Sequence, residues 1–270
     1  MAEQLAIRDS SRILHHLYGE DTLWLSASRR FRGKKKMIVT FHQPETRFKQ
    51  VMPVYWKKMI QSIDCVITLF PKQYEFLREV LGTQNLVLVE HGIDTEYFNP
   101  PVEKNSSLSF CLCVGDHLRD YATLLEAMRF LSREVPELKL VVVSNRLGPA
   151  ERENVAVLRR ISDQRLLDLY RAASFLVLPV NEATASNTLL EGMACGLPVV
   201  TTRQVSFYTN ERGCLYYEPG DVKGLCMSIT NLAHSSDLRT RLGREARARA
   251  EELSWDRVAQ RTLELYERFA

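Results

Sequence analysis

Short apolar segments alternate with amphipathic segments along most of this chain, and this alternation restricts the fold more than any other feature. Runs such as Val87-Leu88-Val89 are apolar without interruption, which is typical of strands buried on both faces of a parallel sheet. The segments between such runs have helical periodicity, as in repeated strand–helix–strand units. The sequence therefore predicts an α/β fold with ligands bound at the carboxyl ends of the strands.

The pattern is interrupted once, near residue 100. The segment 98–107 contains two prolines and a polar tail, which predicts a linker between two α/β halves. Before the linker we expect strands at 13–18, 36–41, 65–70 and 86–90. After it we expect strands at 109–114, 139–144, 155–158, 174–179, 198–202 and 214–217, and helices at 121–134, 163–172, 187–195, 222–233 and 237–253.

The composition excludes several classes of protein. Of 270 residues, 45% are hydrophobic and 26% are charged, so burial of apolar surface can offset the chain entropy that keeps disordered proteins unfolded. No apolar run reaches the roughly 20 residues of a membrane span, and no secretory signal is expected. The six cysteines lack metal-ligand spacing, which indicates buried thiols in a reducing compartment. We therefore expect a cytoplasmic protein without a bound metal or cofactor.

One basic segment stands out against a net charge of only +3. Six cations fall within the eight residues 29–36: Arg29, Arg30, Arg32, Lys34, Lys35 and Lys36. The default interpretation is a solvated turn. The alternative is a patch that binds an anionic acceptor or the inner face of a membrane, supported by aromatic and basic residues at 51–60. No nucleic-acid partner is expected, because no nucleic-acid-binding module accompanies the segment.

The segment 176–200 carries the strongest indication of chemistry. It predicts a buried strand, a loop of small polar residues, a short helix, a glycine and a second buried strand. Such a loop allows backbone amides to approach an anion at the N-terminus of the helix. Glu191 falls about one turn into this helix, where its carboxylate could accept two hydrogen bonds from the vicinal diol of a ribose. A capped helix with a solvated glutamate explains these residues equally well.

Several motifs, in a specific order, resemble those of the retaining, nucleotide-sugar-dependent glycosyltransferases of family four. The motifs are His91-Gly92-Ile93-Asp94, Val114-Gly115, Leu169-Tyr170, Leu190-Glu191-Gly192-Met193-Ala194-Cys195-Gly196-Leu197-Pro198 and Ser254-Trp255-Asp256-Arg257-Val258. The resemblance implies the B-type fold of two Rossmann-like domains. Residues 1–103 would form the acceptor-side domain and residues 104–253 the nucleotide-sugar-binding domain, with the closing helix 254–270 packing back on the first.

The resemblance also implies roles for donor-side residues. Glu191 matches the second glutamate of the family's Glu-x7-Glu motif, which binds the ribose of the nucleotide. Glu182 is the candidate for the first, catalytic glutamate, although it lies nine positions before Glu191 instead of eight; a solvent-facing loop glutamate is the alternative. The further donor-binding residues that we expect are Gly115, Arg119, Ser186, Asn187 and Thr188.

The cation that neutralises the donor diphosphate departs from the family pattern. The family places an arginine directly after the glycine of the Val-Gly pair, whereas Asp116 follows Gly115 here. Arg119 is the nearest cation and is our candidate clamp for the developing charge of the leaving group. A structural arginine paired with an acidic neighbour is the alternative.

The first half contributes one candidate catalytic residue, His42, which follows a predicted strand. In the family, a histidine after the matching strand lies near the donor sugar or the acceptor; a structural histidine is the alternative. Only about 100 residues precede the linker, so we expect a shortened first domain that exposes apolar surface to a second copy or a partner chain.

The function predicted is transfer of a sugar from a nucleotide-sugar donor to an unidentified carbohydrate or lipid-linked acceptor, with retention of anomeric configuration. A non-catalytic nucleotide-sugar-binding or partner subunit is the first alternative, favoured by the altered glutamate and arginine positions. A nucleotide-sugar epimerase of the same fold is the second, disfavoured by the helix that carries Glu191.

Overall fold

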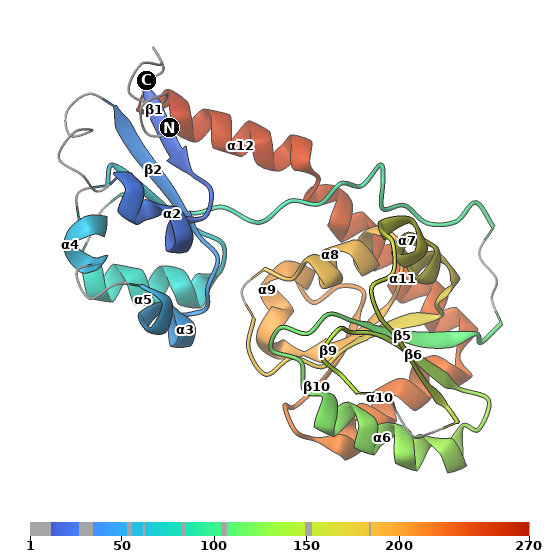
Figure 1. The fold of residues 1–270 in the computed structure, drawn as a ribbon. Coiled ribbons are helices and arrows are strands. Elements are labelled where there is room, and N and C mark those ends of the chain that lie inside the picture. Colours follow the sequence, from blue (N-terminus) through green and yellow to red (C-terminus); the bar gives the residue numbers. More distant parts are fainter. Residues whose placement is uncertain are drawn as a thin grey trace. The chain divides into compact units, whose positions relative to one another are not determined.

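The computed structural model describes residues 12–26, 35–52, 56–61, 63–82, 85–103, 107–148, 153–183 and 185–269 (Figure 1). The chain divides into two compact units. Unit 1 comprises Met1–His91 and Asp256–Ala270, and unit 2 comprises Gly92–Trp255. Each unit contains its own parallel β-sheet, which confirms the expected α/β class.

Unit 1 contains a four-stranded sheet in the order β1-β2-β3-β4, with every neighbouring pair parallel. The strands are β1 (Ile13–His16), β2 (Lys36–Phe41), β3 (Cys65–Thr68) and β4 (Leu86–Leu88). The helices are α2 (Gly19–Ser26), α3 (Glu45–Val51), α4 (Trp56–Ile60), α5 (Pro71–Leu81) and α12 (Trp255–Glu267). Because the strands are parallel, the residues that follow β1, β2 and β4 share one edge of the sheet.

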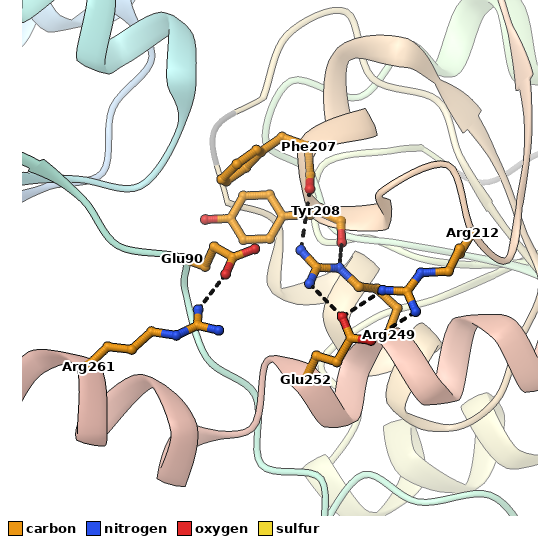
Figure 2. Close-up of polar contacts among 7 residues, drawn as sticks. All are labelled: Glu90, Phe207, Tyr208, Arg212, Arg249, Glu252 and Arg261. Atoms are coloured by element: carbon orange, nitrogen blue, oxygen red, sulfur yellow. Dashed lines mark hydrogen bonds and ion pairs between the residues drawn. The ribbon is translucent and has the colours of Figure 1, made fainter.

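The last helix, α12, is held to this sheet by contacts between residues far apart in the sequence. The hydroxyl of Tyr266 lies 2.5 Å from Nδ1 of His15, which is 251 residues earlier. Arg261 Nη1 donates to Glu90 Oε2 at 2.5 Å (Figure 2). Val258 and Leu265 on the same helix are buried. Residues 256–269 therefore belong structurally with the first part of the chain.

Unit 2 contains a six-stranded parallel sheet in the order β10-β9-β8-β5-β6-β7. The strands are β5 (Phe110–Val114), β6 (Lys139–Val143), β7 (Val155–Leu158), β8 (Phe175–Leu178), β9 (Val199–Thr202) and β10 (Cys214–Tyr217). The helices are α6 (Tyr121–Glu134), α7 (Asp163–Ala172), α8 (Asn187–Ala194), the 3-10 turn η1 (Arg203–Val205), α9 (Ser206–Thr209), α10 (Val222–His234) and α11 (Ser236–Glu252). Helices α6 and α10 lie on one side of this sheet, and α7, α8 and α11 lie on the other (Figure 1).

Both faces of the unit 2 sheet are buried, as the uninterrupted apolar runs predict. All four residues of β8 and all four of β9 are buried. Helix α8 approaches β8 closely, since a Cβ added at Gly192 would lie 2.8 Å from a side-chain carbon of Leu176. The predicted strand and helix positions of unit 2 agree with the structure to within one or two residues at each end.

The residues that lead into the predicted linker 98–107 are held in place within unit 2. Ile93 N donates to the carbonyl of Leu253 at 2.9 Å, and Trp255 N donates to the carbonyl of Ile93 at 3.1 Å. Arg247 Nη1 donates to the carbonyls of Thr95 and Phe98 at 3.1 and 3.0 Å. Hydrogen bonds with Arg247 of α11 and with the residues that follow this helix therefore fix the conformation of residues 93–98.

The end of α11 is also tied to the helical turn α9 (Figure 2). Buried Arg249 donates to the carbonyls of Tyr208 at 2.8 Å and Phe207 at 3.5 Å, and to the Glu252 carboxylate at 3.0 Å. Arg212 donates to both oxygens of Glu252, at 2.9 and 2.6 Å. Arg212 first, and then Arg249, lowers the pKa of Glu252 to about 2. A buried guanidinium thus satisfies the carbonyls at the end of α9.

Two further sequence predictions concern the cysteines and the basic segment. Five cysteines are buried and Cys226 is half-buried, and none is in a disulfide, as expected for apolar-like thiols. Of the basic segment, residues 29–34 lie outside the described residues, while Lys36 Nζ donates to Asp64 at 2.9 Å. Within the described ranges, no helix has the length and hydropathy needed to cross a membrane.

Candidate functional site

The candidate donor site lies where the strand order of the unit 2 sheet changes direction. From β5 the chain progresses outward through β6 and β7, and then returns to β8 on the other side of β5. Parallel sheets bind ligands in the crevice beside such a switch point, because the two loops that follow the central strands diverge there. The two loops here are 115–120, after β5, and 179–186, after β8.

Backbone contacts join the end of the loop after β5 to the start of the loop after β8. Asp120 N donates to the carbonyl of Pro179 at 2.9 Å, and Arg119 forms an isolated antiparallel bridge with Val180. Asp120 also caps α6, since its side chain accepts from Thr123 N at 3.0 Å. The loop after β5 is therefore anchored at both sides, and the position of Arg119 follows from these anchors.

Gly115 and Arg119 form one compact turn at the end of β5. Gly115 has a φ of +92°, a conformation that glycine adopts without the penalty of a Cβ. A Cβ there would lie 3.1 Å from Nη2 of Arg119. The guanidinium donates to the carbonyls of Val114 at 3.0 Å and His117 at 2.9 Å, and to Thr188 Oγ1 at 3.3 Å. These three hydrogen bonds of Arg119 are thus all to carbonyl and hydroxyl oxygens.

Helix α8 presents its N-terminus to the same place. Ser186 caps the helix, because its Oγ accepts from Leu189 N at 3.4 Å. Asn187, in the first turn, is exposed, and Thr188 is buried beside Arg119. The partial positive charge of a helix N-terminus and the guanidinium therefore coincide, which favours an anionic group.

Glu191 lies one turn further along α8, on the same face as Thr188. Its Oε2 accepts a 2.8 Å hydrogen bond from the hydroxyl of Tyr170, a residue of α7 that is fully buried. Burial raises the pKa of Glu191, and the hydrogen bond from Tyr170 opposes this only in part. Burial, together with the charge of Glu191, also raises the pKa of Tyr170. Tyr170 therefore stays a hydrogen-bond donor that orients the carboxylate.

Asp116 occupies the position where the family normally has an arginine, and its side chain contacts the loop after β6. Its carboxylate accepts from the hydroxyl of Ser144 and from Asn145 N at 3.0 Å. Although partial burial opposes it, these hydrogen bonds hold the pKa of Asp116 below its usual range. Asp116 thus fixes the loop that follows β6.

Two of the predicted catalytic residues lie outside this group. Glu182 is half-buried in the loop between β8 and α8. His42 belongs to unit 1, where it follows β2 at the carboxyl edge of that sheet, as predicted. Its ring stacks on Tyr18 with centroids 4.5 Å apart and meets His91 edge-on at 6.3 Å. Both catalytic assignments stay predictions.

Comparison with known proteins identifies the family. Residues 110–235 match the family described as "Glycosyl transferases group 1". The match assigns residues 110–235, which lie within unit 2, to this glycosyltransferase family. The matched residues span β5 to α10 and include every donor-side candidate named above.

Two curated glycosyltransferases illustrate the sequence similarity. An MMP alpha-(1->4)-mannosyltransferase from Mycolicibacterium hassiacum is 30% identical over 205 residues, which are 70% of this chain and 49% of that protein. A mannosylfructose-phosphate synthase from Agrobacterium fabrum is 25% identical over 245 residues, which are 77% of this chain and 53% of that protein. The chain spans about half the length of these relatives.

Solved structures confirm the B-type glycosyltransferase fold. A sucrose-phosphate synthase from Thermosynechococcus elongatus has a TM-score of 0.81 at 21% identity, over 99% of this chain and 76% of that chain. HepE from Anabaena, in complex with UDP and glucose, has a TM-score of 0.80 at 13% identity, over 98% of this chain and 80% of that chain. Both likenesses concern the fold, including its two Rossmann-like sheets.

The sequence alone does not predict the partners that hold the candidate residues in place. Tyr170 was noticed as part of a motif, but its hydrogen bond to Glu191 was not predicted. Its signal was present, since a tyrosine in the apolar face of a helix needs a partner for its hydroxyl. Asp116 was treated only as a departure from a pattern, whereas it accepts hydrogen bonds from the loop after β6.

Proposed function

We propose that this chain transfers a sugar from a nucleotide-sugar donor to an acceptor, with retention of anomeric configuration, and that unit 2 holds the donor. The observation that carries the proposal is the arrangement on α8, beside the switch point of the sheet: the half-buried carboxylate of Glu191 is oriented by Tyr170, and the guanidinium of Arg119 donates to Thr188. Retention comes from the resemblance to family four and rests on that resemblance alone.

Each candidate residue matches one part of a nucleotide sugar. The Glu191 carboxylate, with Oε2 already oriented by Tyr170, can accept hydrogen bonds from the two hydroxyls of a ribose. Arg119 and the N-terminus of α8, including Ser186 and Asn187, supply positive charge for the diphosphate. Such preorganised charge stabilises a leaving group without reorganisation during the reaction, so a strong base is not needed on the donor side.

Glu182 and His42 would act on the sugar and the acceptor. Glu182 lies on the loop that leads into the donor helix, and a carboxylate there could orient the sugar hydroxyls. His42 would present its ring to the acceptor from the carboxyl edge of the other sheet. Both roles come from the family resemblance and not from contacts with a bound ligand.

A specific observation also favours the alternative of a nucleotide-sugar-binding subunit without transferase activity. The residue after Gly115 is Asp116, an acidic residue whose carboxylate accepts hydrogen bonds from the loop after β6, so this position supplies no cation to the diphosphate. Arg119 and the N-terminus of α8 must then act without an arginine at this position, which weakens stabilisation of the leaving group more than binding of the donor. The same test separates these functions from an epimerase, because only a transferase forms a glycosylated acceptor.

The assignment of the donor site is tested by calorimetric titration of UDP and uridine into the full chain, with GDP and ADP in parallel. The Glu191→Gln substitution should weaken the binding free energy of UDP by about 1 to 3 kcal/mol, because a charged acceptor of ribose hydrogen bonds is removed. Arg119→Gln should weaken UDP while sparing uridine. Arg129→Gln is the matched control, since Arg129 is an exposed arginine of α6 that pairs with Glu126.

Two results would contradict the assignment. Unchanged affinity of Glu191→Gln for every nucleotide tested would remove Glu191 from the site. Equal losses for UDP and uridine on Arg119→Gln would make Arg119 structural. Screening nucleotide-sugar hydrolysis and transfer, with and without membrane extract, then decides between enzyme and binding subunit, and the anomeric proton of the product reports retention.

We also propose that residues 29–36 bind an anionic membrane surface at the cytoplasmic face. The support is the density of positive charge in this segment. Co-sedimentation with phosphatidylserine vesicles should fall as salt rises, because the screening length shortens from about 10 Å at 0.1 M to about 3 Å at 1 M. Replacing Lys34, Lys35 and Lys36 with glutamine should also reduce co-sedimentation. If neither added salt nor this replacement changes the binding, residues 29–36 form a solvated turn and the membrane proposal is wrong.

Light scattering on the same samples tests self-association of the chain.

A further inference from the structure

A buried carboxylate lies beside His42 in unit 1. Glu20 is the second residue of α2, and its side chain is only 5% exposed. Helix α2 starts directly against β2, since a Cβ at Gly19 would lie 2.4 Å from Val39 and 2.6 Å from Phe41. Glycine at position 19 therefore allows the helix to approach β2 closely, which brings Glu20 to the end of that strand.

The two oxygens of Glu20 have different partners. Oε1 accepts from the backbone N–H groups of His42 and, at 2.7 Å, of Gln43. Oε2 lies 3.9 Å from Nδ1 of the His42 ring, which is beyond hydrogen-bond distance, so the carboxylate acts on the ring through its charge. Burial alone would raise the pKa of Glu20, but the hydrogen bonds from His42 and Gln43 outweigh it and lower that pKa. Glu20 is therefore an anion that faces the imidazole.

The remaining surroundings restrict the orientation of the ring. The Tyr18 ring stacks on it at an interplanar angle of 19°, and the His91 ring approaches it edge-on. Nδ1 is buried while the side chain as a whole is 25% exposed, so its exposed part lies elsewhere on the ring. In an imidazole, Nε2 points away from whatever Nδ1 faces, and the group beside one nitrogen determines which nitrogen carries the proton.

We propose that Glu20 is a positioning residue for His42: its carboxylate keeps the proton on Nδ1, so that Nε2 is presented as a hydrogen-bond acceptor for a hydroxyl group of the acceptor substrate. The part that concerns the acceptor rests on the proposed function. The part that concerns the proton does not, because it follows from two side chains of unit 1. A carboxylate beside one nitrogen of a neutral imidazole favours the tautomer with the proton on that nitrogen, because the negative charge attracts the N–H group.

The test is the ring tautomer of His42 by ¹⁵N NMR of the full chain, recorded without donor or acceptor at a pH where imidazoles are neutral. The His42→Gln variant assigns the signals. In the wild-type protein we expect the Nδ1–H form to predominate. In Glu20→Gln the amide oxygen can still accept from the His42 and Gln43 backbone, which turns the amide NH₂ toward Nδ1 and disfavours a proton there.

We expect the ratio of Nδ1–H to Nε2–H to fall at least about fivefold in Glu20→Gln, since a charged acceptor is lost. Glu75→Gln is the matched control, because Glu75 is an exposed glutamate of α5 in the same unit. An Nε2–H form in the wild-type protein, or an unchanged ratio in a folded Glu20→Gln, would overturn the proposal. If Glu20→Gln does not fold, the tautomer of His42 in the wild-type protein decides whether the proposal holds. Failure of sugar transfer leaves this result untouched, so the two proposals fail separately.

Discussion

Each unit contains a glutamate near the carboxyl edge of its parallel sheet, and the pKa values of these two glutamates are shifted in opposite directions. Glu20 in unit 1 accepts two backbone N–H groups and faces an imidazole, and its pKa is lowered. Glu191 in unit 2 accepts from Tyr170, and its pKa is raised. Burial opposes ionisation in both cases, so the number of hydrogen-bond donors decides the sign.

This difference suggests two different tasks. A carboxylate whose acceptor positions are filled by N–H groups of the protein can hold a loop or a ring in place. A buried carboxylate with unfilled acceptor capacity gains stability when a ligand brings donors, as the hydroxyls of a ribose would. The comparison therefore supports the proposals of a positioning role for Glu20 in unit 1 and a binding role for Glu191 in unit 2.

The largest effect expected is that of Glu20→Ala. Removing the acceptor of two backbone N–H groups should lower the free energy of unfolding by about 2 to 3 kcal/mol at neutral pH. Because the folded-state pKa of Glu20 is lowered, its stabilisation is complete above the ordinary carboxyl pKa of 4.5 and is lost as pH falls below it. Urea unfolding at pH 7 and at pH 4 measures both effects.

Glu75→Ala, at an exposed position of the same unit, should change stability by less than about 0.5 kcal/mol. If Glu20→Ala proves equally harmless, Glu20 does not hold the loop after β2, and the contrast between the two glutamates is wrong.

A smaller effect, about 1 kcal/mol, is expected for Tyr170→Phe, which removes the hydroxyl that donates to Glu191. The pKa of Glu191 is higher in the folded state than its ordinary value of 4.5. The free energy of unfolding therefore falls as pH rises from 4.5 through the folded-state pKa. Loss of the hydroxyl makes the ionised form still less favourable, so the variant should lose more stability at pH 7 than at pH 4. Chemical unfolding at the two pH values measures the difference.

A double-mutant cycle sharpens this prediction. In a Glu191→Gln background, Tyr170→Phe should lose its pH dependence, because no carboxyl group remains to titrate. A pH dependence that persists in that background would assign it to another group.

The smallest effect is expected for Glu252→Gln, at the end of α11. Its pKa of about 2 arises from Arg212 and Arg249, but its side chain is 38% exposed, so solvent screens the pair. We expect a loss below about 1 kcal/mol at neutral pH, reduced further in 1 M salt. In the wild-type protein, Glu252 contributes to the free energy of unfolding above pH 4.5, and this contribution disappears as the pH falls toward 2. A loss as large as that of Glu20→Ala would show that exposure does not separate these carboxylates.

Much of the fold follows from local sequence patterns. The strands of unit 2 were predictable because burial on both faces requires uninterrupted apolar runs, as in Phe175–Leu178. The start of α7 was predictable as well, since Ser162 caps it by accepting from Arg165 N at 3.2 Å. The turn α9 was missed, because four residues carry too little periodicity.

The features of the candidate site also fall into those that local sequence predicts and those that depend on long-range contacts. The sequence by itself determined that Gly115 ends a strand, that Ser186 caps a helix and that Glu191 lies one turn into it, because these are relations between near neighbours. Only the tertiary structure decided that Arg119 bonds Thr188, 69 residues later, that Tyr170 orients Glu191, and that Glu20 faces His42. The physical reason is that the order of strands in a sheet determines which loops meet, and no local pattern encodes that order.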